Sequence, residues 1–136
     1  NNVLEHLNEP IVTLKDLVAL TKNGGLITIE VPNVGSLKFK VFGKYFSSLD
    51  IPRHLYHYDT KTLAEICKAC GLDILSMRTT GSPKSTVRSL YYALGINGGR
   101  IGALSYYLAD KITKLLGERR INNDVIMLTA KKHGTA

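Results

Sequence analysis

The chain contains few cysteines and no long apolar run, and each scarcity excludes a class of protein. Its 136 residues include two cysteines, too few for the disulfide framework of a small secreted domain. The longest stretch without a charged residue is 89–99, whereas a membrane-spanning helix needs about 20 apolar residues. We therefore expect one domain, residues 1–136, in the reducing cytoplasm and without a transmembrane segment.

Acidic residues are also scarce. Eleven Asp and Glu stand against 18 Lys and Arg, which gives a formal net charge of +7. Such an excess suits nucleic acid, anionic lipid or an anionic substrate, but it does not select among them. The proportions of 44% hydrophobic and 21% charged residues are those of a globular chain rather than a disordered one.

Helix and strand signals alternate along the chain, as in an α/β fold. Pro10 suits a first helical position, and an apolar series with helical spacing follows it as far as Gly24 and Gly25. Residues 26–31 are nearly all apolar, which is typical of a strand covered on both faces in a parallel sheet. In all, we expect helices at 10–21 and 59–70, and strands at 26–31, 72–79 and 125–130.

Two segments lack such clear patterns. Residues 34–58 show no regular periodicity, and a loop of that length in a small domain is often a functional lid. Residues 81–120 give weaker helical signals, at 84–94 and 100–116, so we expect a helical insertion or lid there.

The region 88–120 is rich in tyrosines and basic residues. Such a mixture can bind single-stranded nucleic acid or an anionic membrane, which would make the chain a non-enzymatic binding module. The simpler interpretation is an amphipathic helix with a solvated basic face. We favour it because the sequence contains no known nucleic-acid motif, so nucleic acid is not the expected partner.

Cys67 and Cys70 form a C-x-x-C pair, which is typical of redox sites when it lies at an exposed helix start. Both cysteines instead lie within an apolar helical series, and one such pair supplies only half of a four-ligand zinc site. We interpret them as small buried core residues.

The densest group of polar and aromatic residues is 50–58. His54 and His57 can move protons near neutral pH, and Arg53 can hold a carboxylate or phosphate. The two histidines could share a metal ion, although the nearby sequence offers no obvious third ligand. Alternatively, these side chains only tie the loop to the sheet edge. Near the start of the chain, the Glu5-His6 pair is either a catalytic acid and base or a solvated turn.

Four short pieces in fixed order resemble class I S-adenosylmethionine (SAM)-dependent methyltransferases, in particular a group that modifies small molecules. The resemblance runs from about Asn2 to Thr80, and residues 81–136 match only in a final strand. The pieces are Val3-Leu4-Glu5-His6-Leu7 with Glu9-Pro10, then Leu20 to Gly25, then Ile29 to Asn33, and last Pro52 to Tyr58.

This resemblance implies a Rossmann-like sheet of order 3-2-1-4-5-7-6, of which this chain supplies the second half. Residues 26–31 would be strand 5, residues 72–79 strand 6 and residues 125–130 strand 7, giving a mixed 5-7-6 sheet whose last strand is antiparallel. The glycine-rich loop of the first half is missing. We therefore expect a C-terminal portion that is inactive alone and self-associates through the exposed edge 26–31.

The resemblance also implies roles for individual residues. Leu4, Glu5 and His6 would lie beside the methionine end of SAM, the expected cofactor. Asn33, Arg53 and Tyr56 would contact a small-molecule methyl acceptor, with 34–58 as a long loop on the substrate side. His54 or His57 would be the catalytic base.

Overall fold

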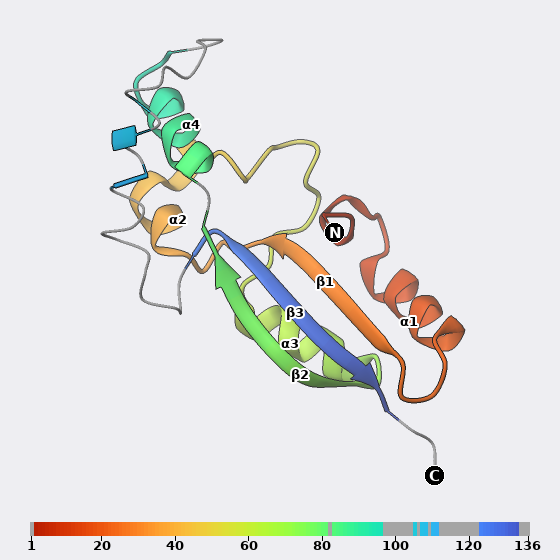
Figure 1. The fold of residues 1–136 in the computed structure, drawn as a ribbon. Helices are drawn as coiled ribbons and strands as arrows, with labels where there is room; N and C mark the ends of the chain where they lie inside the picture. Colours follow the sequence, from red (N-terminus) through yellow and green to blue (C-terminus); the bar gives the residue numbers. More distant parts are fainter. Residues whose placement is uncertain are drawn as a thin grey trace.

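A three-stranded sheet forms the centre of the structure, a computed structural model that describes residues 2–81, 83–96, 105, 107–108, 110–111 and 123–133. Its strands are β1 (Leu26–Pro32), β2 (Leu72–Thr80) and β3 (Val125–Lys132), in the order β1-β3-β2 (Figure 1). Both ladders are antiparallel, so β1 and β2 run in the same direction on either side of β3. This is the expected 5-7-6 order with a reversed last strand.

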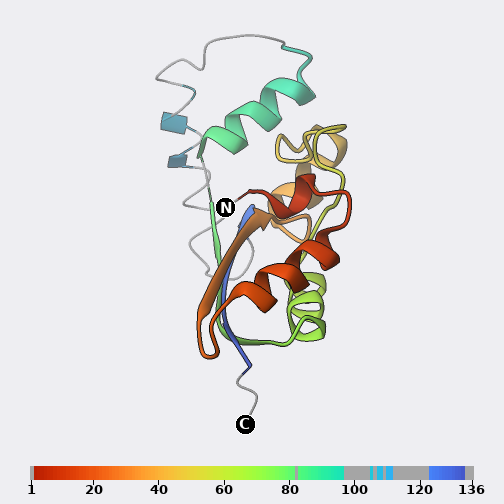
Figure 2. The same cartoon turned by 90° about the vertical axis from the view of Figure 1, so that its right-hand side faces the viewer.

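Helices α1 (Pro10–Leu20) and α3 (Thr60–Ala69) cover the same face of this sheet (Figure 2). Pro10 begins α1, and the side chain of Asp59 caps α3 by accepting a hydrogen bond of 2.7 Å from the Thr62 amide. The buried core lies between these helices and the sheet. It includes Leu14, Val18, Ile29, Val31, Leu63, Cys67, Leu72, Ile126 and Leu128.

The expectation that residues 26–31 are covered on both faces is wrong. Along β1, Ile29 and Val31 are buried against the helices, whereas Leu26 is 61% exposed and Thr28 is also exposed. Thr28 pairs with Thr129 on the face away from the core, where their hydroxyls are 3.3 Å apart. A nearly continuous apolar run therefore forms a strand with one buried face, because the described helices pack on one side only.

The two cysteines are buried and free, as the apolar helical series predicted. Burial raises the pKa of Cys67 to about 11, and burial also raises the pKa of Cys70. A thiol with a raised pKa is a poor nucleophile near neutral pH, which fits a structural role in the core.

The sequence suggested that residues 34–58 form one irregular loop, but the structure shows two short helices there. These are α2 (Leu37–Phe42) and the 3-10 helix η2 (Gly43–Tyr45). The Ser36 hydroxyl accepts a hydrogen bond of 3.1 Å from the Phe39 amide and so caps α2. No residue of α2 is fully buried, and its six residues, in which apolar and basic side chains largely alternate, are too few to show a helical period.

The segment 81–120 is described only in part. Helix α4 (Pro83–Ala93) confirms the helix expected at 84–94. Of the helix expected at 100–116, residues 105, 107–108 and 110–111 are described and are helical. The rest of it, with most of the tyrosine-rich basic region, lies outside the described residues. No helix in the described ranges has the length and apolar character needed to cross a membrane.

Candidate functional site

Polar side chains collect beyond the carboxyl ends of β1 and β2. The 3-10 helix η1 (Leu4–His6), helices α2 and α4, and the loop 46–58 all lie toward this end of the sheet (Figure 1). In α/β sheets, ligands bind beyond the carboxyl ends of the strands. The topology therefore favours this end of the sheet as the position of a functional site.

Glu5, His6 and His54 meet there. One potential metal-ligand atom from each residue lies within 4.8 Å of the others. The two imidazole rings pack edge to face, with centroids 4.7 Å apart and an interplanar angle of 66°. Two segments far apart in the sequence therefore contribute to one cluster, which we call the Glu5–His6–His54 cluster.

Backbone hydrogen bonds hold η1 against the loop. The Glu5 carbonyl oxygen accepts from the amides of Leu55 and Tyr56, at 2.8 and 3.2 Å. The Nδ1 atoms of His6 and His54 each lie 2.9 Å from a carbonyl oxygen, of Arg53 and Ser48 respectively. Because a carbonyl oxygen can only accept, Nδ1 carries the proton in both rings. Whenever a ring is neutral, its Nε2 atom therefore keeps a lone pair.

The Glu5 carboxylate lies inside the protein. Glu5 is 1% exposed, and neither carboxylate oxygen has a hydrogen-bond partner among the described residues. The nearby Tyr58 is buried too, and its hydroxyl donates to the Leu4 carbonyl oxygen at 3.4 Å. Burial, followed by the negative charge of Glu5, raises the pKa of Tyr58 to about 12. An unpartnered buried carboxylate is costly, so its presence here needs a physical reason.

Asp50 lies at the rim of the cluster, with a carboxylate oxygen 3.9 Å from His54 Nε2. Arg53 donates to the same carboxylate through Nε, at 2.9 Å, and through Nη2. Hydrogen bonding from Arg53 lowers the pKa of Asp50, and the same bond raises the pKa of Arg53. The predicted anion-holding arginine is therefore paired with a carboxylate, although its side chain remains 74% exposed.

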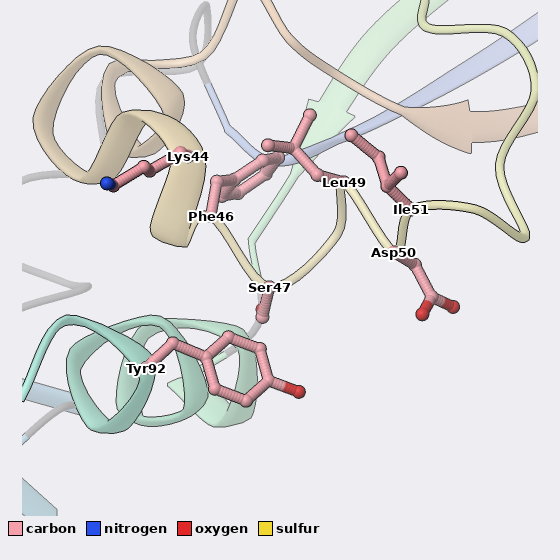
Figure 3. A pocket seen from close by; sticks show the side chains of 7 residues that line it. All are labelled: Lys44, Phe46, Ser47, Leu49, Asp50, Ile51 and Tyr92. Carbon is pink, nitrogen blue, oxygen red and sulfur yellow. The ribbon is translucent and has the colours of Figure 1, made fainter. Parts of the chain in front are cut away.

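A pocket of about 270 Å³ opens beside Asp50, between the loop and α4. Tyr92 of α4 faces the Ser47–Asp50 turn across it (Figure 3). Its other lining residues are Lys44, Phe46, Leu49 and Ile51. The pocket mixes apolar walls with a carboxylate and an ammonium group, so it offers both packing and polar contacts to a small molecule.

The side chains of the other predicted site residues are not members of the cluster. His57 is exposed and makes no hydrogen bond or ion pair with a described residue, while desolvation and then His54 lower its pKa. The Tyr56 hydroxyl donates to the Asn8 carbonyl oxygen at 3.0 Å. Leu4 is part of the buried core.

Asn33 is fully buried, and its side-chain amide is engaged at both ends. The amide nitrogen donates to the Asn123 carbonyl oxygen at 2.7 Å, and the amide oxygen accepts from Gly35 N at 2.9 Å. Asn33 thus fixes the turn after β1 to the start of β3. Because Asn33 is fully buried, a direct substrate contact through this amide would require the side chain to become exposed.

The sequence did not indicate that the Glu5 carboxylate lies beside His6 and His54. It suggested His54 and His57 as a pair because they are close in the sequence, whereas the structure brings His6 to His54. Asp50 and Tyr92 were also missed as parts of the site. Only the fold brings η1 to the loop, so no local spacing could have revealed the cluster.

Comparison with known proteins identifies the family. The sequence profile of a family described as "Methyltransferase domain" matches residues 1–77, more than half of the chain. The chain belongs to this methyltransferase-domain family. Among curated protein sequences, none matches it at a significant level.

Solved structures share its fold. An Archaeoglobus fulgidus SAM-dependent methyltransferase superposes with a TM-score of 0.56 at 18% identity, over 97% of this chain and 57% of its own. A Bacillus halodurans C-125 protein assigned as a methyltransferase gives a TM-score of 0.56 at 12% identity, over 97% of this chain and 67% of its own. The [4+2]-cyclase SpnF gives a TM-score of 0.53 at 16% identity, over 98% of this chain and 48% of its own. This chain thus spans about half to two thirds of the length of each of these proteins.

Proposed function

We propose that this chain forms the acceptor side of a SAM-dependent methyltransferase that acts on a small molecule. It is the C-terminal portion of that enzyme and is inactive alone. The observation that carries the proposal is the meeting of Glu5, His6 and His54 beyond the carboxyl ends of the strands, in a chain of the methyltransferase-domain family. Ligands bind at that end of α/β sheets.

We assign Leu4, Glu5 and His6 to the methionine end of SAM. A buried carboxylate without a protein partner suits the positive charge of the sulfonium and ammonium groups of SAM, and Glu5 provides one. Leu4 lies beneath it in the core and contributes packing. In the described ranges no glycine-rich turn follows a strand, so most SAM contacts have to come from outside them.

When bound, SAM supplies a methyl group on sulfur that a nucleophilic atom of the acceptor can attack in line. The chain's own part is to hold the acceptor and to take up its proton. His54 Nε2 is not used by the backbone hydrogen bond of the ring, and it lies 3.9 Å from Asp50, which lines the pocket. His54 is therefore the proposed base. His57 is the second candidate, and its lowered pKa keeps its imidazole neutral over a wider pH range.

The acceptor is proposed to occupy the pocket beside Asp50. A volume of about 270 Å³ is near the lower limit for small-molecule sites. Arg53 and Tyr56 lie in the same loop, and we retain them as the proposed acceptor contacts. Asn33 supports them indirectly by fixing the turn after β1.

A calorimetric titration of SAM tests this proposal. We expect no binding by the 136-residue chain at millimolar SAM, and micromolar binding by a longer protein whose upstream sequence adds a glycine-rich turn after a strand. Micromolar binding by the chain alone would show that it has a complete site. Absence of binding by the longer protein would overturn the assignment of SAM.

A further inference from the structure

We propose that the Glu5–His6–His54 cluster binds a divalent transition-metal ion. One carboxylate and two imidazoles form a ligand set that suits Zn²⁺, Mn²⁺ or Fe²⁺ better than Mg²⁺, which prefers oxygen ligands. The three residues converge from η1 and the loop, with one potential ligand atom of each within 4.8 Å of the others.

The imidazoles have the hydrogen bonding that metal-ligating histidines usually show. In such sites one ring nitrogen donates to a carbonyl or carboxylate, which fixes the ring and directs the other nitrogen to the metal. His6 and His54 both donate from Nδ1 to backbone carbonyl oxygens at 2.9 Å, and neither Nε2 is used in a hydrogen bond among the described residues. The backbone therefore occupies Nδ1 of each ring and leaves Nε2 as the nitrogen available to an ion.

Glu5 supplies the independent observation. Its carboxylate is almost completely buried and has no hydrogen-bond partner among the described residues, although a buried charge normally has one. A cation beside it would provide that partner. Because no hydrogen bond from a described residue holds the carboxylate in place, it can turn toward an ion without losing such a bond.

The distances allow such an ion after a small contraction. Zinc bonds of about 2.1 Å in a tetrahedral site separate the ligands by roughly 3.4 Å. The three ligand atoms lie within 4.8 Å of one another, and His6 is exposed, so its side chain has room to rotate toward an ion. Three protein ligands leave at least one coordination position open, as in catalytic metal sites.

The consequence for chemistry rests on the proposed function. An ion at the cluster would lie on the acceptor side of the site and would occupy the lone pair of His54, which leaves His57 as the proposed base. An acceptor oxygen bound to the open position would lose its proton more readily. The competing role for Glu5 is contact with the ammonium group of SAM, which needs no metal.

Metal binding is tested by titrating Zn²⁺, Mn²⁺ and, for comparison, Mg²⁺ into chelator-treated protein without SAM. We expect one Zn²⁺ per chain, weaker Mn²⁺, little Mg²⁺ binding, and a metal-dependent rise in melting temperature. Glu5→Gln and His54→Asn should each weaken Zn²⁺ binding at least about 10-fold. His133→Asn is the matched control, because His133 pairs with Asp73 at the other end of β3.

Glu5→Gln also separates metal binding from a merely structural role. It removes a buried carboxylate that has no hydrogen-bond partner in the described part of the chain. The metal-free variant should therefore melt at the same temperature as the parent or higher, while losing the rise with Zn²⁺. The proposal is overturned if Zn²⁺ does not bind, or if binding survives Glu5→Gln and His54→Asn. Since these titrations contain no SAM, their failure leaves the SAM titration to decide the proposed function separately.

Discussion

The ammonium nitrogen of Lys38 lies 3.1 Å from an Asp124 carboxylate oxygen and joins α2 to the start of β3. The Lys38 side chain is 11% exposed and that of Asp124 is 1% exposed. Burial lowers the pKa of Lys38, and the charge of Asp124 opposes this shift. This buried ion pair fixes the helix that leads into the pocket, so its loss should affect both stability and the local fold.

Lys38→Met should lower the free energy of unfolding by about 3 kcal/mol, because it removes the ammonium group that is paired with the buried Asp124 carboxylate. Lys40→Met changes an exposed lysine of the same helix and should have an effect within about 0.5 kcal/mol. Chemical denaturation of both variants at neutral pH measures the difference. Equal effects would mean that the pair contributes no more than a surface lysine.

The cap of α3 should make stability depend on pH. Asp59 accepts hydrogen bonds from the Thr62 hydroxyl and amide, at 2.6 and 2.7 Å, and these bonds lower the pKa of Asp59. A carboxyl whose folded pKa is below its unfolded value stabilises the fold above the unfolded pKa of about 3.9. This contribution is lost as the pH falls through the folded pKa.

Asp59→Ala should therefore cost about 1 kcal/mol at pH 7. Asp59→Asn keeps the cap but not the charge, so the difference between it and the parent should be present at pH 7 and shrink below about pH 4. Urea denaturation over this pH range measures both effects. A difference that persists unchanged at the lowest pH would contradict the role of the charge.

The sequence predicts the helices and strands that have clear boundary signals. It does not predict features that depend on tertiary packing. Pro10, Asp59 and the glycines after each helix correctly locate α1, α3 and the strands that follow them. The apolar run of β1 could not reveal its exposed face, because an all-apolar strand looks the same whether one face or both are covered. Helix α2 has no buried stripe, so its cap was the only local signal.

The candidate site likewise could be predicted only in part, because its arrangement depends on tertiary contacts. The loop with His54 and the η1 turn with Glu5 and His6 were each recognised as polar groups with functional potential. Their meeting depends on hydrogen bonds from Leu55 and Tyr56 to the Glu5 carbonyl, which are backbone contacts that no residue type specifies. Local sequence patterns could identify these residues as candidates, but only the tertiary structure shows that they lie close together.

The buried C-x-x-C pair should be unreactive in the folded protein. Cys67 is 0% exposed and has a pKa of about 11, so little thiolate is available at pH 8. We expect slow reaction of both cysteines with a thiol reagent in buffer and full reaction of two thiols per chain in denaturant. Rapid reaction of the native protein would indicate an accessible redox pair.

Helix α4 is attached to the pocket loop through serines. The Ser89 hydroxyl accepts from the Ser47 amide at 2.9 Å and donates to the Ser85 carbonyl oxygen at 2.8 Å, and Ser89 is fully buried. Ser89→Ala removes the acceptor for the Ser47 amide and should cost about 1–3 kcal/mol. Hydrogen exchange should rise in α4 and in the loop around Ser47. Ser76→Ala, at an exposed strand position, should leave exchange in both segments unchanged.

The two outer edges of the sheet differ in how they resist pairing with another chain. In β2 the register shifts between Ile74 and Ser76, and the exposed Asp73 and Arg78 add charge. Bulges and charges protect edge strands from pairing. In β1 no charged residue precedes Glu30, and an apolar groove of about 220 Å³ runs beside it, lined by Leu7, Leu14, Leu17 and Ile27 among others.

The isolated chain should therefore self-associate through β1. The Asn2 amide donates to the Glu30 carbonyl oxygen at 2.9 Å on the edge away from β3. Because backbone groups of alternate residues point to the same side of a strand, those of Thr28 point to that edge as well. Thr28→Lys places a charge there and should lower the mass measured by light scattering toward that of one chain. Ser76→Lys on β2 should leave the mass unchanged. A parent chain that is already a monomer at high concentration would refute association through this edge.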